Sequence, residues 1–402
     1  MAHLAYSTAG ESHGPALVVT ISGMPAGVGV DSVFINGELA RRQGGYGRGG
    51  RMGIEEDRVE VMAGVRGGAT TGGPVVFLIR NKDSRLEDAG RTPPVHRPRP
   101  GHADLAGSVK FLTSDCRDVL ERASARETAS RVAAGALARC LLREFGIEAF
   151  GFVRSIGGAA TGVAVTEDAW RAVKALRDGS ETGCPDAAAT QRQREIIHAA
   201  KLDKDTVGGL VEAHVFRVPI GLGSCMDWRE KLDARIAYAA MSIQAIKCVE
   251  IGLGREVAER PGSLVHDAIR HDAARVMEAG RPAYHLGFSR PTNNAGGTEG
   301  GMSNGEPIVV RAAMKPISTL LRGMASVDLT TGCAQQSQYE RSDICAVTAA
   351  SVVLENVVAF EIARSFREKF GGDSLAEVRA QVDGYLRLAA VVTPTPPDRA
   401  VS

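Results

Sequence analysis

The chain has few cysteines and none of the spacings that a disulfide framework or a zinc cluster requires. Its seven cysteines are scattered through 402 residues and include no Cys-x-x-Cys pair. The sequence also lacks an uninterrupted run of about 18 apolar residues, and its first residues do not lead from a basic region into an apolar one. We therefore expect no metal site, no membrane partner and no secretion signal, and we place the protein in the cytoplasm.

Lysine and aromatic residues are also scarce. The 48 basic residues comprise nine lysines and 39 arginines, and Phe, Trp and Tyr make up 5% of the chain. The formal net charge of +1 argues against a nucleic acid partner. With 44% hydrophobic and 24% charged residues, the composition is that of a globular protein. We expect one domain over residues 1–390 and a disordered, Pro-rich tail over 391–402.

Apolar periodicity predicts two long buried helices, at 115–145 and at about 341–370. The first contains Glu121-Arg-Ala-Ser and ends at Gly146, and the second begins with Glu340-Arg-Ser-Asp and ends at Gly371. The two copies differ in length, so this is a weak repeat for which chance is the alternative explanation. It suggests that the protein has two similar halves.

Shorter elements are predicted elsewhere. Residues 15–22 are β-branched and predict a strand, and Asp31 is expected to cap a helix that ends at Gly44 or Gly45. A third helix is expected at 229–251, whereas residues 181–206 indicate an exposed, charged connection.

Arginines gather in loops rich in glycine and proline. Segment 41–51 holds four arginines among five glycines, and segment 91–102 is basic and proline-rich. Guanidinium groups and glycine-rich backbone suit phosphate and carboxylate, so the pattern favours a compact polyanionic small molecule. For any single arginine, a solvated surface position is the competing interpretation. The candidate arginines are Arg42, Arg48, Arg51, Arg97, Arg99, Arg122, Arg126 and Arg341.

Two histidines stand beside glycine near these arginines. His13 precedes Gly14, and His102 follows Gly101. A histidine close to arginines and a phosphate can act as general acid to a leaving group at neutral pH. His13 and His102 are therefore candidate acid–base residues.

Three motifs point to other functions, and their context argues against each. The segment from Gly10 to Gly14 matches the nucleophile elbow of esterases, but the predicted strand follows it instead of preceding it. The segment from Gly45 to Gly50 matches a dinucleotide fingerprint, but it follows a helix. The same loop resembles Arg-Gly-Gly segments of RNA-binding tails, yet it is short and stands in a nearly neutral chain.

Six motifs together resemble the chorismate synthase family in their order and spacing. They are Ala9-Gly-Glu-Ser-His-Gly14, Arg97-Pro-Arg-Pro-Gly-His-Ala-Asp104, Glu121-Arg-Ala-Ser-Ala-Arg-Glu-Thr128, Gly300-Gly-Met-Ser-Asn-Gly305, Lys315-Pro-Ile-Ser-Thr319 and Arg341-Ser-Asp343. The resemblance covers about residues 6–370. It implies an α/β (α+β) fold, a β-α-β sandwich with core helices between antiparallel sheets, and a homotetramer.

The resemblance also implies an activity. The family catalyses an anti 1,4-elimination of phosphate from 5-enolpyruvylshikimate 3-phosphate, which gives chorismate and requires reduced FMN. NADPH is a possible source of reductant, with Arg42 and Arg48 at the associated positions. We expect this chain to lack an intrinsic flavin reductase. Two alternatives are a non-catalytic flavin- or anion-binding relative and the RNA-binding protein considered above.

The matching positions imply a role for each site residue. His13 would protonate the departing phosphate with Ser12 beside it, His102 would stabilise the reduced flavin, and Ser124 and Asp343 would act at the flavin N5. Substrate anions would be held by Arg42, Arg48, Arg51, Arg99, Arg126 and Arg341. Flavin contacts would come from Arg122, Ala123, Ser124, Gln244, Ala245, Gly300, Lys315, Pro316, Ile317, Ser318, Thr319 and Arg341.

The chain departs from the family pattern at two positions. His96 stands where a small or polar residue is frequent, and Cys248 replaces a frequent glycine. If that glycine were needed for a positive φ, cysteine would cost about 1 kcal/mol or more.

Overall fold

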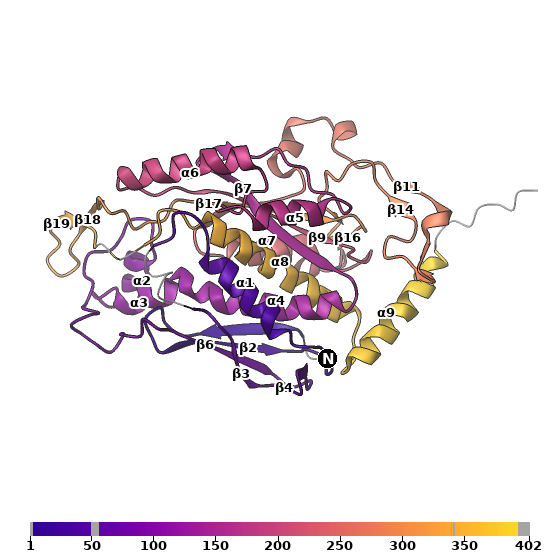
Figure 1. Cartoon of the computed structure of the whole chain (residues 1–402), viewed down its shortest axis with the longest axis horizontal. Coiled ribbons are helices and arrows are strands. Elements are labelled where there is room, and N and C mark those ends of the chain that lie inside the picture. Colours follow the sequence, from indigo (N-terminus) through magenta and orange to yellow (C-terminus); the bar gives the residue numbers. More distant parts are fainter. Residues whose placement is uncertain (1–2, 50–55, 339, 341, 393–402) are drawn as a thin grey trace, which may run out of the picture.

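The protein is a sandwich of two antiparallel sheets with helices between them (Figure 1). The computed structural model describes residues 3–49, 56–338, 340 and 342–392. One sheet has the order β1 (Ala5–Ala9), β2 (Ala16–Ser22), β6 (Val75–Arg80), β3 (Glu60–Ala63). The other has the order β10 (Ile246–Ile251), β17 (Ile308–Met314), β9 (Gly209–Phe216), β7 (Glu148–Ile156), β8 (Ala159–Ala160). The middle layer holds α1 (Ser32–Gln43), α4 (Thr128–Arg143), α7 (Leu232–Met241) and α8 (Val347–Lys369). The expected α+β sandwich is thus confirmed.

The two halves share one topology. The first half runs β1, β2, α1, β3, β6, α4, and the second runs β7, β9, α7, β10, β17, α8. The first sheet has the order β1-β2-β6-β3, and the second, read in the same sense, has the order β7-β9-β17-β10. Each half therefore ends on a long helix of the middle layer, and the weak sequence repeat marks the entrance to both of these helices.

Close packing of α4 against α8 holds the middle layer together. A Cβ atom at Gly135 would lie 2.3 Å from the backbone oxygen of Asn356, so only glycine permits this approach. Arg139, a buried charged residue of α4, is paired with Glu38 at 2.8 Å and with Glu355 at 2.9 Å. This ion cluster joins α1, α4 and α8 without leaving a buried charge unneutralised.

The long predicted helices are shorter than expected. The segment 115–145 forms α3 (Arg117–Ala123) and α4, which are separated by an extended Ser124 and a short 3-10 turn (Ala125–Glu127). The second helix starts only at Val347. In both cases the residues taken out of the helix carry polar groups that line a cavity described below. The predicted helical periodicity was therefore correct, but segments that line the cavity interrupt both predicted helices.

Two other predictions were wrong. The expected helix 229–251 ends at Met241, and after a turn in which Ala245 has a left-handed φ of 66° the chain enters β10. The expected connection at 181–206 contains α6 (Ala187–Leu202). Asp186 caps this helix by accepting from the backbone N–H groups of residues 188 and 189, and Gln193 occupies a buried position that the apolar pattern did not count.

The remaining elements surround the sandwich. Further helices are α2 (Asp104–Lys110), α5 (Trp170–Asp178) and α9 (Leu375–Ala390). Short strand pairs are β4 (Val65–Arg66) with β5 (Ala69–Thr70), β11 (Arg270–His271) with β14 (Phe288–Ser289), β12 (Met277–Glu278) with β13 (Arg281–Pro282), β15 (Thr298–Glu299) with β16 (Met302–Ser303), and β18 (Ala325–Val327) with β19 (Ala334–Gln336). Among the described helices, none is long and apolar enough to cross a membrane.

The domain boundaries stay a prediction. One hydrophobic core includes residues of both sheets and of the helices between them. Of the tail expected at 391–402, residues 393–402 lie outside the described part of the chain.

Replacing Gly135 with alanine should destabilise the protein by about 1–3 kcal/mol, because the added methyl group meets backbone that cannot move away freely. Gly37→Ala is the matched control. Gly37 lies within α1 on the exposed side, and a Cβ there has no neighbour within 4 Å. That substitution should stabilise by up to about 1 kcal/mol. Chemical denaturation of both variants measures the difference, and equal effects would contradict the close α4–α8 contact.

Candidate active site

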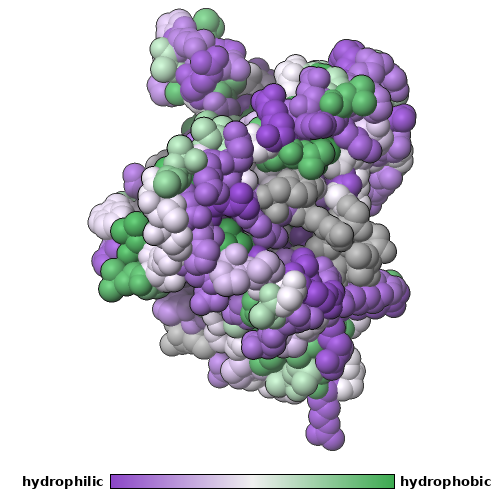
Figure 2. Space-filling view, turned by 90° about the vertical axis from the view of Figure 1, so that its left-hand side faces the viewer, coloured by the Kyte–Doolittle hydropathy of each residue, from purple (hydrophilic) through white to green (hydrophobic). Residues whose placement is uncertain are grey.

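A cavity of about 580 Å³ opens at one end of the sandwich. It is lined by the β1–β2 turn and by corresponding connections of the two halves: α1–β3 with α7–β10, and β6–α4 with β17–α8. Figure 2 shows the side of the molecule that carries α2, α3 and the β18–β19 hairpin, where hydrophilic residues dominate around a hollow. The two halves therefore meet at this cavity.

His13 sits on the β1–β2 turn and is held from behind by Glu121 of α3. Glu121 accepts from the His13 backbone N–H at 2.8 Å and lies 2.9 Å from the ring Nδ1. On the other side of the ring, Arg85 Nη2 is 3.1 Å from Nε2. Burial opposes the charge on Glu121, but the hydrogen bonds and charge of His13, together with Arg117, lower its pKa. Glu121 is thus an ionised partner for the histidine.

His102, like His13, is held by a buried carboxylate. Its ring Nδ1 is hydrogen-bonded to Asp104, whose side chain is fully buried. Arg99 donates from Nε to Asp104 at 2.8 Å and from Nη1 to the Thr319 hydroxyl at 3.0 Å. Burial favours the neutral acid, but hydrogen bonds from His102 and Arg99 hold the pKa of Asp104 well below its usual range. The histidine and the arginine therefore share one buried anion.

Two arginines of the cavity wall, Arg42 and Arg126, share Asp57 as their counterion. Arg42 donates to Asp57 at 3.0 Å and Arg126 donates to its other oxygen at 2.6 Å. Burial lowers the pKa of Arg42 to about 10, against the attraction of Asp57 and with the repulsion of Arg126 and Arg48. Asn81 accepts from Arg126 Nε at 2.9 Å and donates to the turn that carries His13. Two guanidinium groups are thus fixed side by side at the cavity wall.

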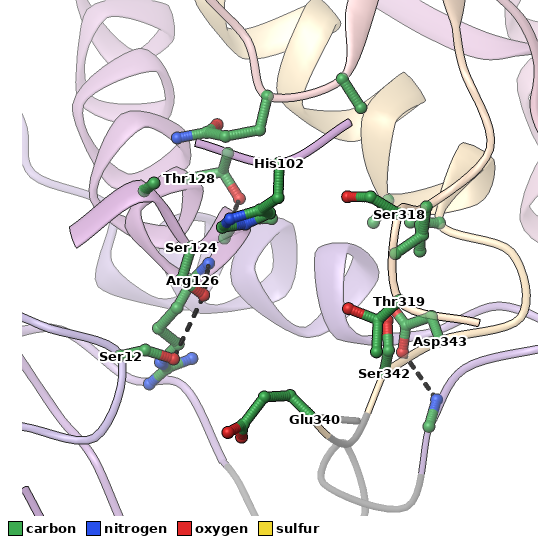
Figure 3. A pocket seen from close by; sticks show the side chains of 18 of the residues that line it. Ser12, His102, Ser124, Arg126, Thr128, Ser318, Thr319, Glu340, Ser342 and Asp343 are labelled. Carbon is green, nitrogen blue, oxygen red and sulfur yellow. Dashed lines mark hydrogen bonds between the residues drawn. The ribbon is translucent and has the colours of Figure 1, made fainter. Parts of the chain in front are cut away.

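The opposite wall carries Asp343 and its partners. Arg48 lies 2.6 Å from one Asp343 oxygen, and the Gly49 backbone N–H donates to the other at 2.6 Å. Ser124 donates from its hydroxyl to Ser12 at 3.2 Å across the cavity from Asp343. Figure 3 shows Ser12, Ser124 and Arg126 on one side and Ser318, Thr319, Ser342 and Asp343 on the other.

An apolar wall separates these polar groups. Ile243, Ala245, Met314, Ile317, Ala346, Ala349, Ala350 and Val353 contribute to it. Burial, followed by repulsion from Lys247, lowers the pKa of Lys315, which donates to the Gly101 carbonyl at 2.9 Å. A flat aromatic ring system with an anionic tail fits this combination of apolar surface and basic groups. Reduced FMN, expected from the sequence, is such a group.

The cavity brings together most of the expected site residues. The lining includes Ser12, His13, Arg42, Arg48, Arg99, His102, Ala123, Ser124, Arg126, Gln244, Ala245, Lys315, Ile317, Ser318, Thr319 and Asp343. Arg51 and Arg341 lie outside the described residues.

Four of the described candidate residues do not line the cavity. Arg97, a candidate for binding an anion, donates to Gln338 instead. Arg122 turns away and donates to the backbone carbonyls of Thr8 and Gly10. Gly300 lies in the β15–β16 turn, and Pro316 is also absent from the wall. The flavin contacts expected for Arg122, Gly300 and Pro316 stay a prediction.

Sequence reasoning missed the buried carboxylates. Glu121 and Asp104 stand inside quoted motifs, yet neither was given a role. Asp57, Asp83 and Arg85 lie outside those motifs. The signal that could have identified Asp104 and Glu121 is that a buried cation needs an anion nearby, and each lies within two residues of a predicted site residue.

The two departures from the family pattern lie away from the chemistry. Cys248 is an exposed residue of β10 opposite Ala313, where the backbone is extended and a side chain carries no φ penalty. His96 lies outside the cavity lining and its Nδ1 is 2.9 Å from the Ser114 carbonyl oxygen. The strain considered for Cys248 is therefore absent.

Comparisons with known proteins point to the same family as the sequence motifs. The family model for chorismate synthase matches residues 4–366. The chain is 53% identical over 393 residues to the chorismate synthase of Pelobacter propionicus, covering 95% of this chain and 98% of that protein. It is 52% identical over 396 residues to that of Geobacter metallireducens, with coverage of 95% and 98%. A crystal structure of chorismate synthase superposes with a TM-score of 0.78 at 37% identity, covering 97% of this chain and 99% of that one.

Asp57→Asn should destabilise the protein by about 3–5 kcal/mol, because it leaves Arg42 and Arg126 buried together without their shared anion. Glu60→Gln is the matched control, since Glu60 pairs with Arg80 on the exposed surface of the first sheet. It should leave the free energy of unfolding nearly unchanged. Urea denaturation of the two variants distinguishes them, and a small effect at Asp57 would refute its role as a shared counterion.

Proposed function

The chain belongs to the chorismate synthase family, and we propose that the cavity between its two halves is the active site. The protein is a lyase that converts 5-enolpyruvylshikimate 3-phosphate into chorismate. This reaction is the last step of the shikimate pathway, which supplies aromatic amino acid biosynthesis. The observation that carries the assignment of the site is the convergence of two histidines and five arginines on one cavity, with a buried carboxylate behind each histidine.

The arginines suit the charges of the substrate. 5-Enolpyruvylshikimate 3-phosphate carries one phosphate and two carboxylates, and a guanidinium fork matches the geometry of both groups. Arg42 and Arg126 are already fixed side by side by Asp57. They would bind an anion without first losing side-chain freedom, which favours affinity. Arg48 and Arg99 would hold the remaining anionic groups from the other walls.

His13 is suited to protonate the leaving phosphate. Its Nδ1 is taken by Glu121, so Nε2 is the nitrogen beside the cavity groups Arg85 and Asp83. A proton given from Nε2 to the bridging phosphate oxygen neutralises charge as the C–O bond breaks. Ser12 lies next to His13 in sequence and receives the Ser124 hydroxyl, which supports a relay of hydroxyl groups along this wall.

Reduced FMN fits the apolar wall and the basic groups around it. When bound, it would supply an electron-rich ring close to the reacting carbon atoms. Gln244, Ala245, Ile317, Ser318 and Thr319 would surround it, and Lys315 would face its anionic part. His102 would hold a proton near the ring, while Ser124 and Asp343 would assist removal of the C6 proton of the substrate.

The same proposal includes a homotetramer in the cytoplasm and no intrinsic flavin reductase. Arg42 and Arg48, the positions associated with NADPH, are engaged by Asp57 and Asp343 respectively. Both arginines line the cavity together with His13, and we assign them to the substrate.

The direct test is turnover under anaerobic conditions with chemically reduced FMN. We expect phosphate release and chorismate absorbance from 5-enolpyruvylshikimate 3-phosphate, and no turnover with oxidised FMN alone. NADPH with oxidised FMN should also fail, because no reductase is expected. Flavin binding without turnover would indicate a binding relative, and RNA binding that falls steeply with salt would favour the Arg-Gly alternative.

His13→Ala should lower turnover by about two to four decades, the range expected for loss of a general acid. Flavin binding should stay close to that of the unmodified chain, because His13 is placed at the leaving group and not at the ring. Stopped-flow turnover and flavin titration measure the two effects separately. Near-normal turnover would remove His13 from the reaction.

A further inference from the structure

Glu121 lies behind His13 and outside the cavity. Its side chain has no exposed surface, and it is not among the residues that line the cavity. One carboxylate oxygen accepts from the His13 backbone N–H at 2.8 Å, and the two oxygens lie 2.9 and 3.0 Å from the ring Nδ1. The carboxylate therefore forms hydrogen bonds with both the backbone and the ring of His13. Because it does not border the cavity, it has no direct contact to offer a substrate.

The contacts of the ring define where its protons lie. A guanidinium group only donates, so Nε2 accepts from Arg85 at 3.1 Å. In this neutral form the single ring proton is on Nδ1 and is donated to Glu121. Nε2 is thereby left as the nitrogen that can take up and release a proton on the side of the cavity.

We propose that Glu121 is a positioning residue for the reaction, which fixes the tautomer of His13 and provides the counter-charge of its protonated form. This inference rests on the proposed function, in which His13 gives a proton to the leaving phosphate. The carboxylate–histidine arrangement is a general way to set ring orientation and basicity. The proton leaves Nε2 for the phosphate oxygen, and the electron pair of the broken C–O bond stays on phosphate. The electron pair of the broken C6–H bond replaces it in the new diene, and the C6 proton passes to solvent, from which neutral His13 regains a proton.

The charges around the ring make this counter-charge necessary. Arg85 faces Nε2 and Arg117 lies 3.4 Å from Glu121, so two cations oppose a positive charge on the histidine. Asp83 lies 3.8 Å from Nε2 and favours that charge together with Glu121. Without Glu121, the two nearby arginines would disfavour the imidazolium ion. The phosphate of a bound substrate would in turn attract both Arg85 and the protonated ring.

The neighbourhood of Glu121 keeps it ionised. Burial works against its charge, but hydrogen bonds from His13 and the charge of Arg117 lower its pKa. Arg117 is itself anchored, since it donates to the Pro93 carbonyl at 2.7 Å and to Glu340 at 3.1 Å. Glu121 therefore has a fixed place and a fixed charge before any substrate arrives.

Glu121→Gln is the sharpest variant, because it keeps the size of the side chain and an oxygen for Nδ1–H but removes the charge. The basic limb of the kcat/KM–pH profile should move to lower pH by about one to two units, which lowers kcat/KM about 10- to 100-fold above that limb. KM should change little.

Glu121→Asp retains the charge and should restore part of the shift. Asp118→Asn is the matched control, because Asp118 is exposed on the same helix, and its profile should stay in place.

A second measurement does not depend on turnover. NMR titration of histidine-labelled full-length protein, with His13 assigned by comparison with His13→Asn, reports the tautomer and the protonation of the ring. We expect the Nδ1–H tautomer in the unmodified chain, and a lower titration midpoint in Glu121→Gln with thermal unfolding still cooperative. An unchanged midpoint and an unchanged basic limb would overturn the role of Glu121. If the unmodified chain shows no turnover, the proposed function fails, while the titration still tests the Glu121–His13 pair.

Discussion

Cations withdrawn from water need anions beside them, and this constraint governs the construction of the cavity. Arg42 and Arg126 share Asp57, Arg99 and His102 share Asp104, His13 rests on Glu121, and Arg48 pairs with Asp343. Leaving any of these arginines unneutralised would cost several kcal/mol. The anions also fix the side chains in place, so that a multiply charged substrate would meet a preorganised set of donors. The same carboxylates thus neutralise the arginines and hold the side chains of the site in position.

The internal duplication explains where the site lies. Corresponding connections of the two halves converge at the same end of the sandwich, and each leads into a central helix, α4 or α8. The related segments Glu121–Ser124 and Glu340–Asp343 each place a polar residue in the cavity, Ser124 from one half and Asp343 from the other. The first residues of the two segments differ in position, because Glu121 is buried behind His13 whereas Glu340 borders the cavity. The same short pattern therefore has two different roles in the wall of the cavity.

The sequence predicted the strand β2, the helix α1 and its Asp31 cap, and the buried character of α4 and α8, since these depend on local periodicity and capping. It failed where tertiary contacts override that period. Ser124 breaks an otherwise helical segment, and Ala245 adopts a left-handed φ before β10. The motif residues that line the cavity were predicted through the family resemblance. Asp57 and Arg85 were not, because a charged residue whose partner is distant in sequence has no signature in its own neighbourhood.

The position of each carboxylate indicates the part it can take. Asp57, Asp104 and Glu121 lie behind the wall, shielded from any bound anion, so they can remain charged while a phosphate occupies the cavity. Asp343 borders the cavity and is paired with Arg48. A bound anion would compete for that arginine and would leave Asp343 without its counterion. A carboxylate that borders the cavity can contact a substrate directly, whereas the carboxylates behind the wall can only hold their cations. This difference supports assigning proton transfer to Asp343 and positioning to Glu121.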